Sequence, residues 1–270
     1  MYPNREVFPY APLALVAAEI RFTDAARLRQ QETRDKIAIA VEERFPIAEA
    51  LHQANFNLAV GGGGPPQLQE RFGVVLKSPD STESMTIMPE SLTYETTAYH
   101  TFEELLRAVT VACEALVEAK VQPALQRVGL RYIDEVRVPE PVVDVRQWSR
   151  WINGRLVGHL DVGPDDYPAT STQIVSTYDL GEGRGLNVRC AALDQGTIVV
   201  SQHLKRAAVE SGPFFVLDFD GFRDFANQDL VQLSAVVVRD ALTAVHVPCG
   251  TAFQRSITDE ARALFRGEGS

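Results

Sequence analysis

The sequence lacks most of the patterns that define metal, redox or familiar catalytic sites. Its three cysteines, Cys113, Cys190 and Cys249, form no C-x-x-C or Cys/His pattern, and its five histidines show no metal-ligand spacing. No H-E-x-x-H, G-x-S-x-G or kinase motif is present. Three thiols cannot all pair, so we expect small buried hydrophobic residues in a reducing compartment. The sequence predicts no bound metal and no cofactor.

Long hydrophobic runs are also absent. The N-terminal apolar run over 11–18 has Pro9 and Pro12 at its start and is followed by Glu19 and Arg21. It is shorter than the roughly 20 apolar residues that span a bilayer, and its flanks differ from those of a signal peptide. We therefore expect a cytoplasmic protein with no membrane segment.

The overall composition is that of a globular protein with an excess of negative charge. Hydrophobic residues make up 45% and charged residues 23% of the 270 residues, which excludes disordered, collagen-like and coiled-coil classes. Acidic residues outnumber basic ones by 36 to 26, for a net charge of −10. Because this charge repels a phosphate backbone, direct nucleic-acid binding is disfavoured. The length suits one or two domains.

The first half of the chain has the pattern of antiparallel strands followed by a long helix. A capping box at Thr101 and Glu104 precedes an apolar stripe, which marks the start of the best helix. A glycine-rich loop at 61–64 is followed by two prolines and a strand, which is the wrong context for phosphate binding. We predict strands over 13–22, 54–60, 67–76, 84–97 and 128–138, and helices over 24–45 and from 101 onward.

The second half repeats this pattern after a connector at 139–157. We predict strands over 173–180, 186–193, 197–205 and 214–219, and helices over 227–246 and 258–265. The predicted fold class is α+β, with two related lobes, each a curved antiparallel sheet with a long helix packed on one face. The predicted division is an N-terminal lobe over 1–138, the connector over 139–157 and a C-terminal lobe over 158–270.

Two acidic residues near a strand end form the first candidate site. In Asp218-Phe219-Asp220 both carboxylates project to the same face of the strand, because side chains alternate. With a third ligand such as Asp134 they could hold a divalent cation, or they could hold a basic partner. In the structural alternative one acid faces solvent and the other caps a turn or pairs with Arg223.

A strand arginine forms the second candidate. Alternation places Arg131 and Ile133 on one face of their strand and Tyr132 and Asp134 on the other. Because an unpaired buried guanidinium is costly, we expect a mostly buried Arg131 that pairs with Glu19, Asp218 or Asp220 and ties non-adjacent strands together. An exposed arginine that reaches a ligand or partner anion is the alternative. The candidate binding or structural-network residues are Glu19, Arg21, Arg131, Tyr132, Asp134, Asp218 and Asp220, and none is assigned a catalytic role.

Several segments of the sequence resemble a known family. They are Tyr2-Pro3, Ala11-Pro12-Leu13, Glu19-Ile20-Arg21-Phe22, the run from Arg127 to Asp134, Leu217-Asp218-Phe219-Asp220, His246 to Phe253 and Ile257 to Glu260. In these segments the chain resembles a sporadically distributed family of uncharacterised bacterial proteins, about 250 residues long, with no agreed activity. Many relatives are expected to have Asn where this chain has Asp134. The patchy occurrence of the family is similar to that of mobile defence, toxin–antitoxin or accessory genes.

Three functional hypotheses follow. The first is a non-enzymatic protein-binding or accessory protein, such as an antitoxin, an immunity protein or a defence-system subunit, whose negative charge suits a basic partner. The second is a metal-dependent or nucleotide-handling enzyme that uses Asp218, Asp220 and Asp134 with Arg131. The third is a small-ligand cradle between helix and sheet. Self-association stays open.

Overall fold

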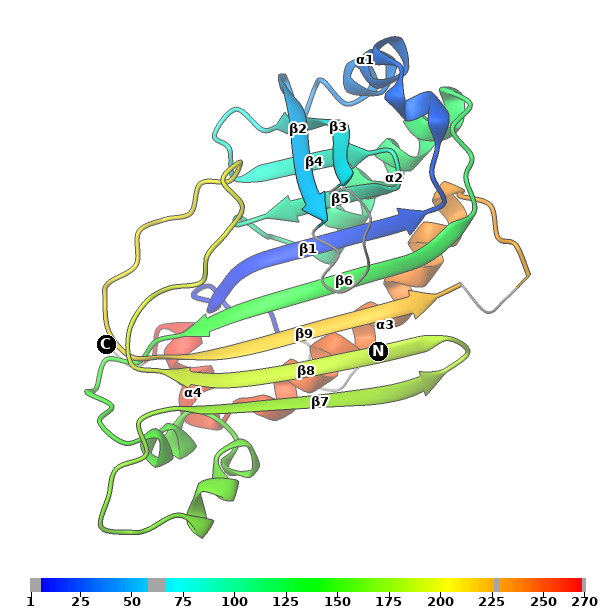
Figure 1. Ribbon diagram of the computed structural model, residues 1–270. Helices are drawn as coiled ribbons and strands as arrows, with labels where there is room; N and C mark the ends of the chain where they lie inside the picture. Colours follow the sequence, from blue (N-terminus) through cyan, green and yellow to red (C-terminus); the bar gives the residue numbers. More distant parts are fainter. Residues whose placement is uncertain (1–5, 58–66, 226–228, 269–270) are drawn as a thin grey trace.

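The computed structural model describes residues 6–57, 67–225 and 229–268, without the side chains of 53–57 and 67–71 (Figure 1). The predicted glycine-rich loop at 61–64 lies outside the described residues. Nine strands form one antiparallel sheet in the order β2-β3-β4-β5-β1-β6-β9-β8-β7. The strands are β1 Leu13–Phe22, β2 Ile47–Asn57, β3 Gln67–Lys77, β4 Glu83–Met88, β5 Ser91–Thr96, β6 Leu125–Val136, β7 Thr172–Gly181, β8 Arg184–Leu193 and β9 Phe214–Asp224.

The α+β content agrees with the predicted class, but the prediction of two lobes is wrong. One open sheet runs through the molecule, because β1 and β6 each pair with a neighbour on both sides. β1 pairs with β5 and with β6, and β6 also pairs with β9 in an unbroken register from Arg127 to Val136. The sheet therefore continues across the boundary expected at 138. Alternation along a strand shows its faces but not its neighbours, so the sequence could not reveal this joining.

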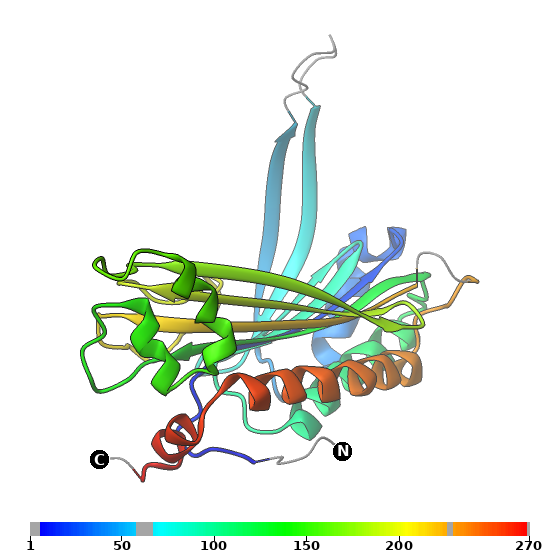
Figure 2. The ribbon, with the colours of Figure 1, turned by 90° about the horizontal axis from the view of Figure 1, so that it is seen from below.

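Two long helices cover one face of the sheet. Figure 2 shows α2 (Phe102–Glu118) and α3 (Ala235–Ser256) on the same side. As predicted, Thr101 caps α2, accepting a hydrogen bond from the backbone N–H of Glu104 at 3.2 Å. The other helical elements are η1 Ala26–Arg29, α1 Gln31–Ala40, η2 Val145–Arg150, η3 Gly154–Leu156, η4 Gly158–Val162 and α4 Asp259–Arg266. The apolar faces of the sheet and the helices form the main core.

Proline positions explain two wrong element boundaries. The predicted helix over 227–246 is α3, which runs on through Pro248 to Ser256. A proline inside a helix removes one backbone hydrogen bond, and packing against the sheet compensates for this loss. The predicted strand over 84–97 is two strands, β4 and β5, that turn at Pro89 and Glu90. The predicted helix over 24–45 is the short η1 followed by α1.

The opposite face of the sheet is partly covered by a loop. Residues 197–205 form no strand, contrary to the prediction. Instead Leu204, with Ile198 and Val200, packs on Leu15 and Ile133 of the sheet. The apolar residues that suggested a strand therefore pack against the face of the sheet. They do not form an additional strand at its edge.

The β2–β3 hairpin extends beyond the rest of the sheet (Figure 2). β2 and β3 pair along their whole length, from Ile47 opposite Lys77 to Asn57 opposite Gln67. β3 pairs with β4 only from Val74 to Lys77. The outer part of the hairpin is thus a two-stranded ribbon.

Among the described residues, no helix has both the length and the apolar character needed to cross a membrane.

Candidate functional site

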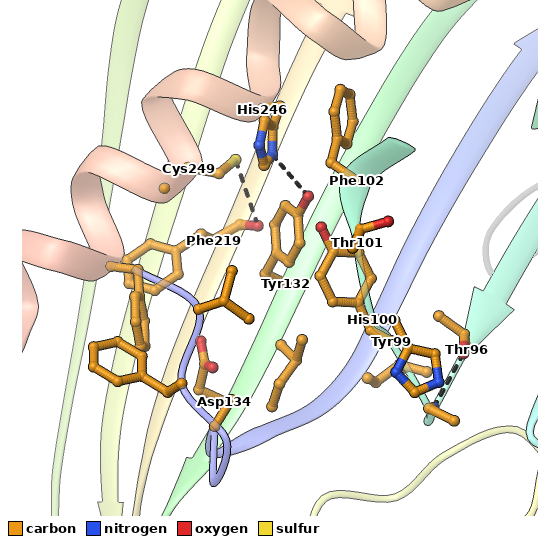
Figure 3. A pocket seen from close by; sticks show the side chains of 18 of the residues that line it. Thr96, Tyr99, His100, Thr101, Phe102, Tyr132, Asp134, Phe219, His246 and Cys249 are labelled. Carbon is orange, nitrogen blue, oxygen red and sulfur yellow. Dashed lines mark hydrogen bonds between the residues drawn. The ribbon is translucent and has the colours of Figure 1, made fainter. Parts of the chain in front are cut away.

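A cavity of about 660 Å³ lies between the N-terminal segment, the helix-covered face of the sheet and α3 (Figure 3). β6 and β9 form its floor with Tyr132, Asp134 and Phe219, and α3 contributes His246, Cys249 and Phe253. The segment from the end of β5 to the first turn of α2 lines another side. Apolar and aromatic side chains make up most of the lining, so a bound molecule would be largely removed from water.

The N-terminal segment is fastened over the cavity by contacts with the end of the chain. Glu6 forms a bidentate ion pair with Arg266, at 2.5 and 2.7 Å. The backbone N–H of Tyr10 donates to the carbonyl oxygen of Phe265 at 3.0 Å. Phe8 is buried and packs edge-on against Phe253 of α3 and Phe265 of α4. The wall formed by residues 6–13 is therefore part of the folded structure.

Asp134 is the polar group that distinguishes this cavity. Its residue is 3% exposed, and its Oδ2 atom has no hydrogen-bond partner among the described residues. Burial, and to a lesser degree the charge of Asp218, raises the pKa of the carboxyl group to about 8. At neutral pH the unliganded site thus presents a protonated carboxylic acid in apolar surroundings.

A hydrogen-bonded aromatic cluster lies beside Asp134. The hydroxyl of Tyr132 and Nδ1 of His246 are 2.9 Å apart. The ring of Phe102 stacks on His246 with centroids 4.0 Å apart, and Tyr99 meets Tyr132 edge-on at 5.7 Å. Three distant parts of the chain, the segment at the start of α2, β6 and α3, therefore meet in one cluster.

Cys249 lines the cavity as an inert thiol. Its Sγ lies 3.9 Å from the carbonyl oxygen of Leu130 and 4.0 Å from that of Phe219. Burial raises the pKa of the thiol to about 12, so it is not a thiolate nucleophile at neutral pH. A Cβ atom at Gly221 would lie 2.8 Å from this Sγ, so the glycine allows α3 to approach β9. All three cysteines are buried, as predicted.

Arg131 lies on the opposite face of the sheet and is half exposed rather than mostly buried. Its Nε and Nη2 donate to Oδ1 and Oδ2 of Asp218 at 2.8 and 2.7 Å, so the predicted ion pair is present. The partner strand is the adjacent β9, not a distant one. Arg189 donates to the same carboxylate at 3.3 Å. The sheet buries Asp218, while the side chains of its arginine partners stay in contact with solvent, at 46% exposed for Arg131 and 38% for Arg189.

Asp220 and Glu19 belong to the same charged surface. Arg127 bridges them, with Nη2 3.1 Å from Asp220 and Nη1 3.3 Å from Glu19. Arg21 also pairs with Glu19, at 3.0 Å. Each acid thus has an arginine partner, and neither Asp218 nor Asp220 relies on Arg223, whose guanidinium lies over the Phe225 ring.

The predicted site residues therefore fall into two groups. Strand alternation places Tyr132 and Asp134 at the cavity, whereas Glu19, Arg21, Arg131, Asp218 and Asp220 lie on the other face. The proposed third ligand Asp134 does not converge with Asp218 and Asp220. In the described part of the chain, no three His, Cys, Asp or Glu side chains are grouped to hold a metal ion.

Sequence reasoning missed the partners of Tyr132. His246 was expected to end a helix but lies inside α3, 114 positions along the chain from Tyr132. Phe102 was interpreted only as part of a core stripe. The one signal in the sequence was that Tyr132 and Asp134 share a strand face; nothing local indicated which helix covers that face.

No family model and no curated protein matches the sequence. Among solved structures, the comparison gives the outer membrane protein AlkL, determined by solid-state NMR in DMPC lipid bilayers. The identity is 11%, the match covers 86% of this chain and 93% of that chain, and the TM-score is 0.10. A score this low supports no conclusion about fold or function.

Proposed function

We propose that this protein binds a small, largely apolar organic molecule in the cavity between the N-terminal segment, the sheet and α3. The observation that carries the proposal is an apolar cavity of about 660 Å³ with a single unsatisfied buried carboxyl group, that of Asp134, in its lining. Ligand sites in proteins combine a volume of this order with a few directed polar groups. A hydrogen bond from a bound molecule would satisfy the Oδ2 atom of Asp134, which has no partner among the described residues.

The stability cost of Asp134 supports a functional role. An unpartnered buried carboxyl lowers stability, whereas an apolar residue of similar size would pack at no such cost. The paired acids on the opposite face show that the same sheet can satisfy its carboxylates with arginines. A contribution to stability does not explain why Asp134 lines a cavity without an arginine partner, whereas a ligand-binding role does.

The experiment is a titration with Nile red, an uncharged dye that fluoresces in apolar surroundings. We expect saturable binding to the full chain at one site. Ala98→Phe places a large ring in the cavity lining and should abolish binding, whereas Ala207→Phe, at an exposed loop position, should leave it unchanged. Both variants must show the wild-type melting transition. Equal dye binding by both variants would overturn the proposal.

The β2–β3 hairpin supports a second candidate function, the binding of a protein partner. An isolated two-stranded ribbon is marginal in water, and the outer part of β3 has a neighbour on only one side. Such an edge can accept an additional strand, and the net charge of −10 favours a basic partner.

The test of this candidate is to shorten the ribbon by replacing residues 51–73 with a two-residue turn. A partner that co-purifies in a stoichiometric complex with the full chain should be lost from the shortened chain, which should still fold and bind Nile red. If the complex survives the shortening, the ribbon is not the partner-binding element.

A further inference from the structure

We propose that the molecule bound in the cavity carries an ammonium group, which forms an ion pair with Asp134 against the aromatic rings of Tyr132 and Phe219. This inference rests on the proposed small-molecule function and specifies its ligand class, an organic cation with an apolar body. Three independent features of the cavity support it.

The first feature is the sign of the charges in the lining. Two acids, Glu6 and Asp134, are among the residues that line the cavity, and none of those lining residues is a lysine or arginine. Glu6 is already paired with Arg266, which leaves Asp134 as the acid without a counter-charge. An anionic ligand would find no permanent positive charge among these lining residues, whereas a cation would find a carboxyl group without a counter-charge.

The second feature is the aromatic wall beside that carboxyl group. Tyr132 precedes Asp134 by two residues on the same face of β6, and Phe219 of β9 is the register partner of Tyr132. Figure 3 shows both rings in the same part of the cavity as Asp134. Phe253 meets Phe219 edge-on at 6.4 Å and extends the wall. The faces of aromatic rings attract cations, most strongly where water is excluded.

The third feature is that Asp134 is held in a poorly solvated position without a donor. A cation would stabilise the ionised form that the empty site disfavours, so binding must expel the proton of Asp134. The titratable groups that line the cavity with it are Glu6 from the N-terminal segment, Tyr99 and His100 from the segment before α2, Tyr132 from β6, and His246 and Cys249 from α3, and Asp218 lies behind the sheet. Tyr132 and His246 are hydrogen-bonded to one another, and the Cys249 thiol stays protonated.

The test compares a cation with its neutral isostere on the full chain. Benzyltrimethylammonium and neopentylbenzene have nearly the same shape and differ in one positive charge, and each is titrated against bound Nile red. At pH 8 we expect the cation to bind at least tenfold more tightly than the isostere. Because the cation must displace a proton from a group with a pKa of about 8, its affinity should fall about tenfold for each pH unit below 8. The affinity of the isostere should not change with pH.

The matched variants are Asp134→Asn and Asp220→Asn, which replace one carboxyl group each on opposite faces of the sheet. Asp134→Asn should bind both probes with similar affinity at every pH, whereas Asp220→Asn should keep the wild-type preference. Isothermal titration calorimetry of the wild-type chain in two buffers of different ionisation enthalpy should show close to one proton released per cation bound at pH 7.

The outcomes separate this inference from the proposed function. If Nile red binds but the neutral probe binds as tightly as the cation, or neither probe displaces the dye, the ammonium inference is overturned and the cavity remains a ligand site. If Nile red itself fails to bind, the proposed function fails and the inference fails with it.

Discussion

Asp134 and Glu135 are neighbours on β6 and show how one strand creates two opposite environments. Both residues are buried, at 3% and 5% exposed. The pKa of Asp134 is raised to about 8, because burial is not offset by any donor. Burial by itself also raises the pKa of Glu135, but the backbone N–H of Ile198 and the guanidinium groups of Arg206 and Arg137 outweigh it and lower that pKa. Burial raises the pKa of both carboxyl groups, and the hydrogen-bonding and charged partners decide whether the net shift is upward or downward.

Asp134 and Glu135 have different partners because different parts of the chain cover the two faces of the sheet. The loop over 197–206 brings Arg206 to 2.6 Å from Glu135, and Arg137 lies at 2.7 Å on the same face. The cover over Asp134 consists of α3 and the N-terminal segment, and the cavity lies between them. One face thus holds its acids in ion pairs, and the other holds a buried acid, Asp134, whose Oδ2 has no hydrogen-bond partner among the described residues.

The largest expected effect is a gain of stability from Asp134→Asn. Because the folded-state pKa is raised, the folded protein takes up a proton relative to the unfolded chain between about pH 4 and pH 8, and wild-type stability falls as pH rises through that window. Asparagine does not titrate and avoids this loss. The variant should exceed the wild-type free energy of unfolding by up to about 4 kcal/mol at pH 7, since one pKa unit is worth about 1.4 kcal/mol.

Urea denaturation at pH 4, 6 and 8 measures this effect. The difference between variant and wild type should be near zero at pH 4, should grow as pH rises to about 8 and should then level off. Asp220→Asn is the control, because Asp220 is paired with Arg127 and its loss should not stabilise the protein. A difference that is the same at all three pH values would show that the Asp134 carboxyl is not protonated in the folded state.

Glu135→Gln should have the next largest effect, with the opposite sign. It removes the carboxylate that accepts from Arg206, from Thr197 at 3.0 Å and from the N–H of Ile198 at 2.8 Å. We expect a loss of about 3 kcal/mol at pH 7, the range for breaking a buried pair. Because the pKa of Glu135 is lowered on folding, this contribution is present above the unfolded pKa of about 4.3 and is lost as pH falls through the folded value.

Urea denaturation at pH 7 and pH 3, with amide hydrogen exchange over residues 197–206, checks this prediction. Exchange should accelerate in that loop before the rest of the chain. Glu182→Gln, at an exposed turn, is the matched control and should change stability by less than about 0.5 kcal/mol. Unchanged exchange in the loop would show that Glu135 does not hold it on the sheet.

Arg131→Ala should cost less, about 1 kcal/mol, although its ion pair with Asp218 is bidentate. The arginine side chain is 46% exposed and Arg189 stays beside the carboxylate, so the charge of Asp218 is not left alone. Arg131→Lys should recover part of the loss, because an ammonium cannot form two parallel bonds. A double-mutant cycle with Arg189→Ala measures the coupling, and a loss above 3 kcal/mol for Arg131→Ala alone would contradict the half-exposed environment.

The sequence predicted elements better than it predicted their assembly. The periodicity around Thr101 and along 13–22 located α2 and β1, because caps and alternation are local properties. The pairing of β1 with β6 joins residues more than 100 positions apart, and no local pattern encodes it. The apolar pattern over 197–205 was misleading, because Ile198, Val200 and Leu204 pack on the sheet from a loop rather than from a strand.

The candidate site divides in the same way. Alternation correctly separated Arg131 from Asp134. The need of a strand arginine for an acid predicted a pair with Glu19, Asp218 or Asp220, and the structure shows Asp218. The cavity itself depends on where α3 and the N-terminal segment cross β6, which is tertiary information. His246 could not be assigned to it, because the helix was expected to end at His246, whereas α3 continues to Ser256.

The smallest expected effect is that of Tyr132→Phe on the cavity side. The tyrosine hydroxyl is hydrogen-bonded to His246, so its removal should cost about 0.5 kcal/mol, the lower end of the usual net range for one hydrogen bond. Tyr178→Phe, at an exposed position of β7, should cost nothing measurable. The decisive measurement is the double variant Tyr132→Phe with Asp134→Asn. If the Tyr132 hydroxyl is hydrogen-bonded only to His246 and not to Asp134, the changes in unfolding free energy of the two single variants should add to within about 0.5 kcal/mol. A larger coupling would mean that tyrosine and aspartate share a network, and that Asp134 has a partner within the chain after all.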